Sequence, residues 1–327
     1  MKSGYWFVYA FVFLGFSHSQ GAEAEVERTQ VQRVDGSPIS LEIIRDDSES
    51  QVPLLLLIDG SLCVPSLLGA SMQMLLPESS GVSGYAVGIV EKTGVTSPEP
   101  DEDGGYSFGP DFECSDEFRR YYSIDHRVTD HLRAIQHLRR HADWWDGRLF
   151  IWGHSDGGRI GGRVAAFTPE TERMVLGGFG GGERMATEFK DFHICRDDRV
   201  ESRSECVSEL ESQFQDIRDN PTPLKTWMGS ANSWQVWSTR LDAVEANVLE
   251  DVTVPLLIYH GTEDQSTPVS SARALIEHLN HRAEMDLVYH EIEGMGHGLG
   301  SGLSAETRTD LHQGFLSWLL FGDDEVR

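Results

Sequence analysis

Gly153-His154-Ser155-Asp156-Gly157 decides the fold of this 327-residue chain. The residues before it, 148–152, are mostly apolar and predict a short buried strand, and the small residues after it, 158–166, predict a helix. A strand, a sharp turn that carries a serine and a helix place the hydroxyl at the end of a sheet. The flanking glycines allow the strand and helix to approach closely. The pattern therefore predicts an α/β fold with Ser155 as a nucleophile, and the alternative is an ordinary glycine-rich turn.

Two adjacent carboxylates follow a later apolar stretch. Residues 254–258 predict a buried strand that ends at Gly261, and the loop behind it carries Glu263 and Asp264. Parallel sheets place their chemistry at the carboxyl ends of their strands. We therefore expect one of these carboxylates near Ser155. The alternative is that both are solvated loop acids.

His297 is singled out by its position among the chain's 13 histidines. It lies in a glycine-rich loop, 294–300, between a predicted last strand, 285–292, and an amphipathic helix, 311–320. A neutral imidazole can take the proton of a serine hydroxyl and return it to a leaving group, while a carboxylate fixes its tautomer. We expect His297 to be this base. The alternative is an ordinary surface histidine.

These motifs resemble the α/β-hydrolase superfamily, and within it the single-domain bacterial hydrolases related to dienelactone hydrolase and prolyl oligopeptidase. The resemblance covers residues 50–182 and 250–320, with the serine, acid and histidine in the chain order of that superfamily. It implies a mainly parallel central sheet flanked by helices. The family pattern Gly-x-x-Asp-x-x-x-Pro, found at residues 261–268, favours Asp264 over Glu263.

The resemblance also implies an oxyanion hole made of two backbone N–H groups. One donor is expected from Asp156, the residue after the nucleophile, and the other from the loop behind the apolar strand 53–58. Many hydrolases carry His-Gly-x in that loop, whereas this chain has Asp59-Gly60-Ser61. A backbone donor does not depend on the side chain that departs from the pattern. We expect Ser61 as the second donor, with Leu62 as the alternative, and such a donor contributes about 3 kcal/mol to lowering the barrier.

The first 24 residues are predicted to be a signal peptide. Lys2 precedes a mostly apolar segment, 5–16, and two small-x-small motifs, at residues 17–19 and 22–24, are candidate cleavage sites. The alternative is an uncleaved membrane anchor. No other stretch approaches the roughly 18 apolar residues that would span a bilayer. We therefore expect an exported protein, periplasmic or extracellular, with no stable membrane insertion after signal cleavage.

The remainder is predicted to be one hydrolase core with one insertion. Residues 25–182 and 251–327 carry the strand and helix pattern of the core, whereas residues 183–250 are polar and helical in period. By the resemblance, this segment is a helical cap. Its acids Glu201, Glu205, Glu209 and Glu211 are expected on a solvated helix face, with amine binding as the alternative. Three tryptophans in its second half either pack its core or line a substrate site: Trp227, Trp234 and Trp237.

Four cysteines fit an exported chain, because an even number permits two disulfides. We expect Cys195 and Cys206, which are close in sequence, to pair. Cys63 and Cys114 would then tie the oxyanion loop to the segment before the next helix. The alternative is four free thiols.

The net charge of −26 argues against nucleic acid or an anionic membrane as a partner. The chain has no Cys-x-x-Cys or His-Glu-x-x-His motif and no phosphate-binding glycine loop, so we expect neither a metal nor a cofactor.

The sequence favours a secreted, carboxylesterase-like serine hydrolase that cleaves a small-molecule ester through an acyl-enzyme. Ser155 would attack, His297 would transfer the proton and Asp264 would orient His297. Two alternatives keep the same catalytic residues, namely a serine peptidase or aminopeptidase acting on a peptide, and a thioesterase. A third is a non-catalytic binding protein on a hydrolase scaffold, because one fold hosts many functions.

Overall fold

The computed structural model describes residues 26–46, 51–68, 84–96, 114–196, 200–228, 231–282 and 285–322, and the expected signal peptide lies outside them. Its elements follow in the order β1 (Val26–Gln32), β2 (Pro38–Ile44), β3 (Val52–Ile58), the 3₁₀ turn η1 (Ser66–Leu68), β4 (Ala86–Val90), α2 (Asp116–Tyr121), α3 (Ile124–His141), β5 (Trp145–His154), α4 (Asp156–Ala166), β6 (Thr171–Gly177), α5 (Met185–Glu188), the π-helical turn η2 (Phe189–His193), α6 (Arg203–Asp219), α7 (Trp234–Arg240), α8 (Glu245–Leu249), β7 (Leu256–Gly261), α9 (Val269–Leu279), β8 (Leu287–Ile292) and α10 (Ala305–Phe321).

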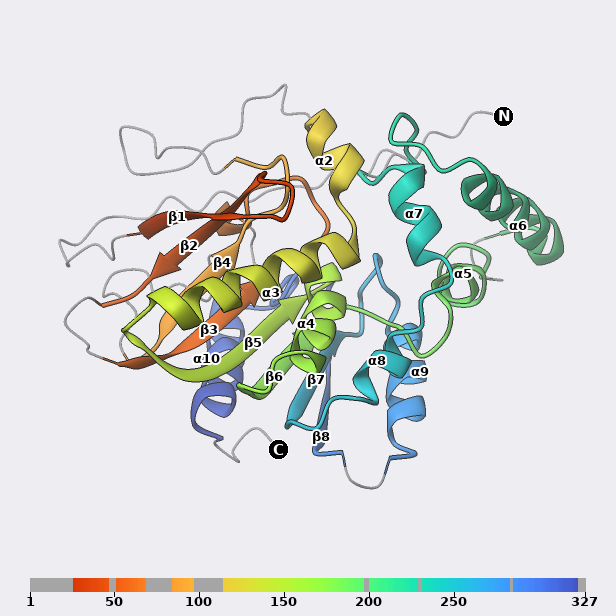
Figure 1. Ribbon diagram of the computed structural model, residues 1–327. Helices are drawn as coiled ribbons and strands as arrows, with labels where there is room; N and C mark the ends of the chain where they lie inside the picture. The colour runs from red at the N-terminus through yellow and green to blue at the C-terminus, as the bar shows by residue number, and fades with distance from the viewer. Residues whose placement is uncertain are drawn as a thin grey trace.

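The eight described strands form one sheet in the spatial order β1-β2-β4-β3-β5-β6-β7-β8 (Figure 1). β2 pairs antiparallel with both β1 and β4, and every pairing from β4 to β8 is parallel. Parallel neighbours need crossover connections, and helices lie in each connection from β4 to β8. The mainly parallel sheet with flanking helices confirms the α/β-hydrolase fold predicted from the sequence.

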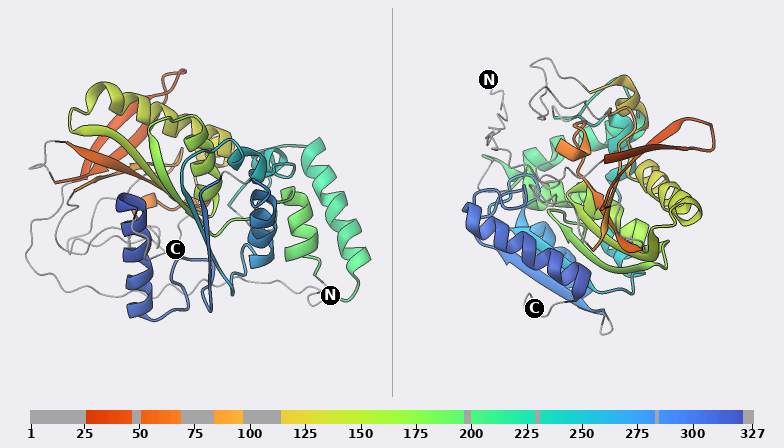
Figure 2. Two further views of the ribbon diagram at one scale, coloured as in Figure 1. Left: turned by 90° about the horizontal axis from the view of Figure 1, so that it is seen from below. Right: turned by 90° about the vertical axis from the view of Figure 1, so that its left-hand side faces the viewer.

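Both faces of the sheet are buried because its central strands are apolar along their whole length. In β3, Leu54 and Leu56 join the core under α3, α4, α8 and α9, whereas Leu55 and Leu57 join the core under α10. Successive side chains of a strand point to opposite faces, so such a strand needs a cover on each side. Figure 2 shows α3 and α10 on opposite sides of the sheet. No helix in the described ranges is both long and apolar enough to cross a bilayer.

The connection between β6 and β7 holds α5, η2, α6 and α7, which lie together beyond the carboxyl ends of the strands (Figure 1). These helices share a separate aromatic core, in which Trp227 and Trp237 meet ring to ring and both contact Phe189. Trp227 and Trp237 are buried in this core, whereas Trp234 is half-buried at its edge. α8 belongs instead to the main core, where it packs on α4 through Ala246 and Leu249.

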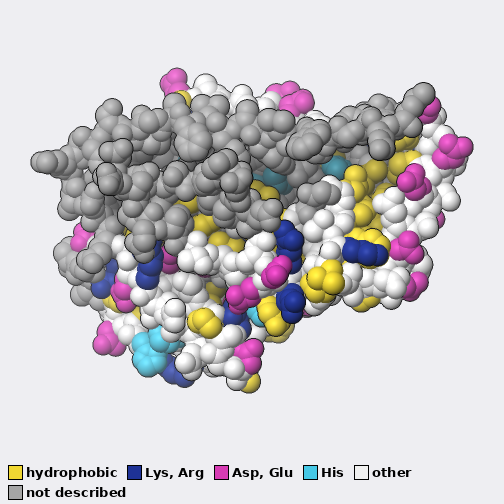
Figure 3. Space-filling view, turned by 90° about the horizontal axis from the view of Figure 1, so that it is seen from above, with side chains coloured by type: hydrophobic (Ala, Val, Ile, Leu, Met, Phe, Trp, Pro, Cys, Tyr) yellow, Lys and Arg dark blue, Asp and Glu magenta, His cyan; other side chains and the backbone are white. Residues whose placement is uncertain are grey.

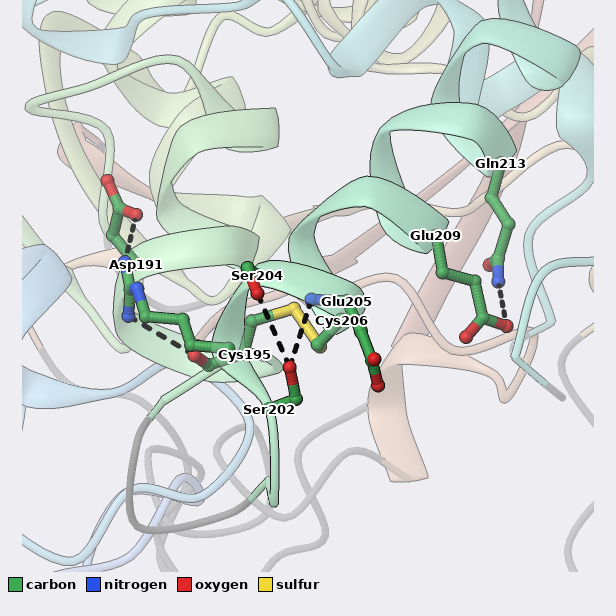
Figure 4. The surroundings of a disulfide bond; sticks show 9 residues. Asp191, Cys195, Ser202, Ser204, Glu205, Cys206, Glu209 and Gln213 are labelled. Carbon is green, nitrogen blue, oxygen red and sulfur yellow. Dashed lines mark hydrogen bonds and ion pairs between the residues drawn. A yellow bond between two sulfur atoms is a disulfide. The ribbon is translucent and has the colours of Figure 1, made fainter.

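A disulfide fixes the start of α6 (Figure 4). The bond between Cys195 and Cys206 joins the segment after η2 to the first turn of this helix. Ser202 caps the same turn by accepting the N–H of Glu205, and Arg203 donates to the carbonyl of Cys195. The outer side of α6 is polar. The four acids expected on a solvated face are all exposed, and Figure 3 shows acidic side chains at the right-hand end, where α6 lies.

The two disulfides are expected to stabilise the fold to different degrees. Cys63–Cys114 closes a 51-residue separation and Cys195–Cys206 an 11-residue separation. Because a crosslink restricts the unfolded chain more when its loop is longer, removing the first should cost about 4 kcal/mol and removing the second about 3 kcal/mol. Equilibrium unfolding in urea of the two paired Cys→Ala variants measures both losses. A larger loss from the Cys195/Cys206 variant would contradict this ranking.

Candidate active site

The turn at Ser155 is strained and is held by its glycines. Ser155 has φ 57° and ψ −123°, a conformation that residues with a side chain rarely adopt. A Cβ on Gly157 would overlap the carbonyl oxygen of Ile58 in β3, and a Cβ on Gly153 would overlap that of Gly157. β5 therefore ends, and α4 begins, on either side of the half-buried Ser155. The positive end of the α4 dipole lies beside its hydroxyl.

Ser155, His297 and Asp264 form a continuous hydrogen-bonded series. The Ser155 Oγ lies 3.1 Å from His297 Nε2, and His297 Nδ1 lies 2.8 Å from Asp264 Oδ2. Asp264 is 4% exposed, whereas its competitor Glu263 is exposed to solvent. Of the two carboxylates considered from the sequence, the structure brings Asp264 to the histidine. The three side chains come from the ends of β5, β7 and β8.

Close packing of two loops brings His297 to Asp264. Gly261 ends β7, and a Cβ there would overlap the carbonyl oxygen of Met295 in the histidine loop. The N–H of Glu263 donates to the same carbonyl at 2.9 Å. The N–H of Gly294 donates to the Thr262 hydroxyl at 2.9 Å. These contacts fix the histidine loop on the carboxylate loop.

The surroundings of Asp264 keep it ionised. Its Oδ1 accepts the N–H groups of Ser266 and Thr267, each at 2.8 Å. Burial opposes ionisation, but hydrogen bonds from His260 and His297 hold the pKa of Asp264 well below its usual range. A carboxylate can only accept, so His297 Nδ1 carries the proton and Nε2 is left to accept from Ser155.

His260 and His154 were not identified from the sequence as part of the site. His260 is fully buried, and its Nε2 lies 2.7 Å from the carbonyl oxygen of Thr267 and 3.3 Å from Asp264 Oδ2. The spacing of four residues between His260 and Asp264, at the end of a buried strand, was the available signal. The ring of His154 lies 5.1 Å from that of His297, between centroids. Burial, together with His297, lowers the pKa of His154 to about 3, so His154 stays uncharged beside His297 at neutral pH.

Asp156 links the serine turn to the β6–β7 connection. Its buried carboxylate accepts from the Tyr122 hydroxyl at 2.9 Å and pairs with Arg240 of α7. Burial raises the pKa of Asp156, but Arg240 and Arg159 outweigh it and hold that pKa below its usual range. From the sequence, Asp156 was expected to act through its backbone only, and no local pattern predicted Arg240 beside it.

The loop expected to supply the second oxyanion donor lies against Ser155. A Cβ built on Gly60 would lie 3.3 Å from Ser155 Cβ and 3.6 Å from its Oγ, so the glycine permits a close approach. The Asp59 carboxylate pairs with the buried Lys92 ammonium at 2.8 Å. Farther along, Cys63 is bonded to Cys114 at the foot of α2. Ser61 is half-buried, whereas Leu62 is 54% exposed.

The arrangement joins a hydroxyl, an imidazole and a buried carboxylate in one hydrogen-bonded series, with the Gly60 backbone beside the hydroxyl. Such a series can activate a hydroxyl for attack on a carbonyl carbon. Within the described part of the chain, no group of three or more histidines, cysteines or acids could hold a metal ion.

Two buried histidines should make the fold sensitive to acid. Burial lowers the pKa of both His154 and His131 from 6.5 to about 3. Below about pH 6.5 the unfolded chain therefore binds protons that the folded protein does not. The stability that the two neutral rings contribute is complete above pH 6.5 and falls as the pH drops toward 3, by up to about 1.4 kcal/mol per pH unit for each ring.

Urea unfolding between pH 7 and pH 4.5 measures this slope. His154→Gln should reduce the slope by about one proton. His281→Gln, at an exposed histidine after α9, is the matched control and should leave the slope unchanged. An unchanged slope in the His154 variant would contradict the prediction.

Solved structures of α/β-hydrolases share this fold. The acylaminoacyl peptidase of Pyrococcus horikoshii matches with a TM-score of 0.58 and 14% identity, over 93% of this chain and 43% of that protein. Est1E from Butyrivibrio proteoclasticus matches with a TM-score of 0.53 and 13% identity, over 88% of this chain and 97% of that one. The esterase domain of a Rhodothermus marinus protein matches with a TM-score of 0.54 and 14% identity, over 90% and 97%.

The chain thus spans less than half of the length of the acylaminoacyl peptidase that it resembles. No curated protein matches the sequence. The family described as serine aminopeptidase, S33, matches residues 115–301, which is more than half of the chain and includes Ser155, Asp264 and His297. The chain therefore belongs to the serine aminopeptidase S33 family of α/β-hydrolases.

Proposed function

We propose that this protein is a serine hydrolase that cleaves a carboxylic ester through an acyl-enzyme, with Ser155 as nucleophile, His297 as general base and acid, and Asp264 as its orienting carboxylate. The observation that carries the proposal is the unbroken hydrogen-bonded series from Ser155 Oγ through His297 to Asp264. The strained backbone of Ser155 supports it, because such strain is stored at functional sites.

The first half of the reaction forms the acyl-enzyme. The Ser155 hydroxyl proton passes to His297 Nε2 as Oγ bonds to the carbonyl carbon. The carbonyl oxygen becomes an oxyanion, which accepts from the N–H groups of Asp156 and Ser61. When the intermediate collapses, the bond to the alcohol oxygen breaks and His297 returns the proton to that oxygen.

The second half releases the acid. Water gives a proton to His297 Nε2 and its oxygen attacks the acyl carbon, and collapse of this second intermediate returns the proton to Ser155 Oγ. Asp264 stays ionised throughout and stabilises the imidazolium in both halves. The pKa of Asp264, held low by its hydrogen bonds, suits this role.

Removing the nucleophile should abolish both labelling and turnover. We expect Ser155→Ala to lose reaction with a fluorophosphonate probe, and to lose hydrolysis of p-nitrophenyl butyrate by at least about 10³-fold. Asp264→Asn should lose about 10⁴-fold, because it would favour the wrong tautomer of His297. Glu263→Gln, next to it but exposed, is the matched control and should keep full activity. Full activity in Ser155→Ala would overturn the assignment.

Peptide hydrolysis is the second candidate, and the description of the family favours it. An aminopeptidase needs a carboxylate for the free amine of its substrate. The four acids of the α6 region are exposed to solvent, and the buried Glu188 and Glu245 face Arg159 within ion-pair distance. None of these six acids is both buried and without an arginine partner, which supports an ester over an unblocked peptide.

A comparison of substrates tests this choice. We expect kcat/KM for short acyl p-nitrophenyl esters to exceed that for aminoacyl naphthylamides by at least about 10²-fold, because an amide also needs its leaving amine to be protonated. Cleavage of naphthylamides without cleavage of esters would establish the peptidase instead. The rates of the Ser155→Ala variant with both substrates give the background hydrolysis, which is subtracted.

The segment 183–250 is proposed to act as a cap over the site, with residues 25–182 and 251–327 as the core. Two contacts support this role. Arg240 of α7 pairs with Asp156, and His193 Nε2 lies 3.0 Å from the carbonyl oxygen of Gln265, next to Asp264. The connection thus contacts both the serine turn and the carboxylate loop, so its position would affect access to them.

Export is proposed on two grounds. The first 24 residues have the pattern of a signal peptide. The two disulfides, Cys63–Cys114 and Cys195–Cys206, are bonds that persist in oxidising compartments.

A further inference from the structure

Arg127, in the first turns of α3, contacts the loop expected to supply an oxyanion donor. Its side chain is buried, with 2% of the residue exposed. The Nη1 group donates to the carbonyl oxygen of Asp59 at 2.7 Å and lies 3.4 Å from that of Gly60. The contact spans 68 and 67 residues of sequence, so it joins two distant parts of the chain.

The guanidinium has no carboxylate partner in the described structure. Its Nε and Nη2 atoms are buried and have no hydrogen-bond acceptor. Its other close neighbour is the Tyr122 ring, whose centroid lies 5.9 Å from the guanidinium carbon. A buried charge without a counter-ion costs several kcal/mol, and an apolar side chain could fill the same space. Packing therefore does not explain Arg127, and its two backbone contacts require another reason.

The geometry of a peptide unit supplies that reason. In a trans peptide the C=O and N–H groups point in opposite directions, and the described chain has no cis peptide. The closer contact, at 2.7 Å, fixes the Asp59–Gly60 peptide, and the longer one, at 3.4 Å, is made to the Gly60 carbonyl. The N–H of this second peptide, which belongs to Ser61, therefore points away from Arg127. The Gly60 backbone that carries this peptide lies against Ser155.

The charge of Arg127 also strengthens the donor. A cation at the carbonyl end polarises the peptide and makes its N–H more positive, and chains of hydrogen bonds reinforce one another in this way. The effect is larger in a buried site, where water does not screen the charge. Lys92 acts differently, because it pairs with the Asp59 side chain and not with a peptide carbonyl.

We propose that Arg127 is a positioning residue that aims and polarises the Ser61 backbone donor of the oxyanion hole. This inference rests on the proposed function, since it requires an oxyanion at Ser155. In this role, the buried Arg127 of α3 holds the loop in the orientation in which the Ser61 N–H can donate. Arg127 itself touches no reacting atom.

The test compares three substitutions at Arg127 with a control at a second arginine that contacts the same helix from outside it. R127M removes charge and donors, R127Q keeps one amide donor, and R127K keeps the charge. Arg33→Met is the matched control, because Arg33 also binds α3, through Asp130 at 2.6 and 2.8 Å, but does not contact the loop.

With p-nitrophenyl butyrate, kcat should fall about 10²-fold in R127M and at least about tenfold in R127Q, with KM nearly unchanged, because the donor acts in the transition state. R127K should stay within about tenfold of the wild type. R33M should keep its kcat even where its melting temperature falls.

A trifluoromethyl ketone separates an oxyanion effect from a loss of structure. Ser155 adds to this ketone and forms a hemiketal oxyanion, so its Ki should rise in proportion to the loss of kcat/KM across the Arg127 series. The matching methyl ketone, used as a reference for simple binding, should bind all variants alike. If R127M does not fold, R127Q and R127K provide the same comparison.

Wild-type kcat and ketone affinity in the folded R127M or R127Q variant would overturn the inference alone. Losses of kcat that track the fall in melting temperature across all variants, R33M included, would also overturn it. A wild-type protein that neither hydrolyses esters nor reacts with the fluorophosphonate would overturn the proposed function, and the role of Arg127 with it.

Discussion

The strained turn at Ser155 is the constraint on which the site depends. Its positive φ is maintained because β3, β5 and α4 meet where Gly153 and Gly157 leave no room for a side chain. That contact fixes the direction of the hydroxyl and the start of α4 together. The loops that carry Asp264 and His297 then approach a hydroxyl whose position is already fixed. Gly261 allows them to do so by bringing the two loops into backbone contact.

Buried cations surround this turn in a protein whose net charge is −26. Lys92, Arg127 and Arg240 lie under or beside the two segments expected to donate to an oxyanion. Lys92 and Arg240 pair with Asp59 and Asp156, so their charges are balanced locally. Among the described residues no carboxylate pairs with Arg127, so its charge lies unbalanced beside the loop expected to donate to the oxyanion. The overall acidity of the chain therefore says little about the electrostatics of its site.

The β6–β7 connection is coupled to the serine turn by a buried ion pair. Arg240 reaches from α7 to the carboxylate of Asp156, and the Tyr122 hydroxyl completes the set. Breaking a buried pair by removing one partner typically costs about 3–5 kcal/mol, because the remaining charge stays buried. A movement of α7 away from the site would break this pair and cost a similar free energy. The pair therefore favours one position of these helices over the serine turn.

Local pattern in the sequence determined the strand, turn and helix around Ser155, the carboxylate and histidine loops, and the order of the three residues. These features were predictable because glycine spacing and apolar periodicity act over a few residues. The family pattern at residues 261–268 had already favoured Asp264 over Glu263. The tertiary structure alone decided that His260 supports this carboxylate, and that Arg127 and Arg240 reach backbone and side-chain groups 67 to 84 residues away. Such contacts depend on how distant segments pack, and one sequence carries no local signal of which segments become neighbours.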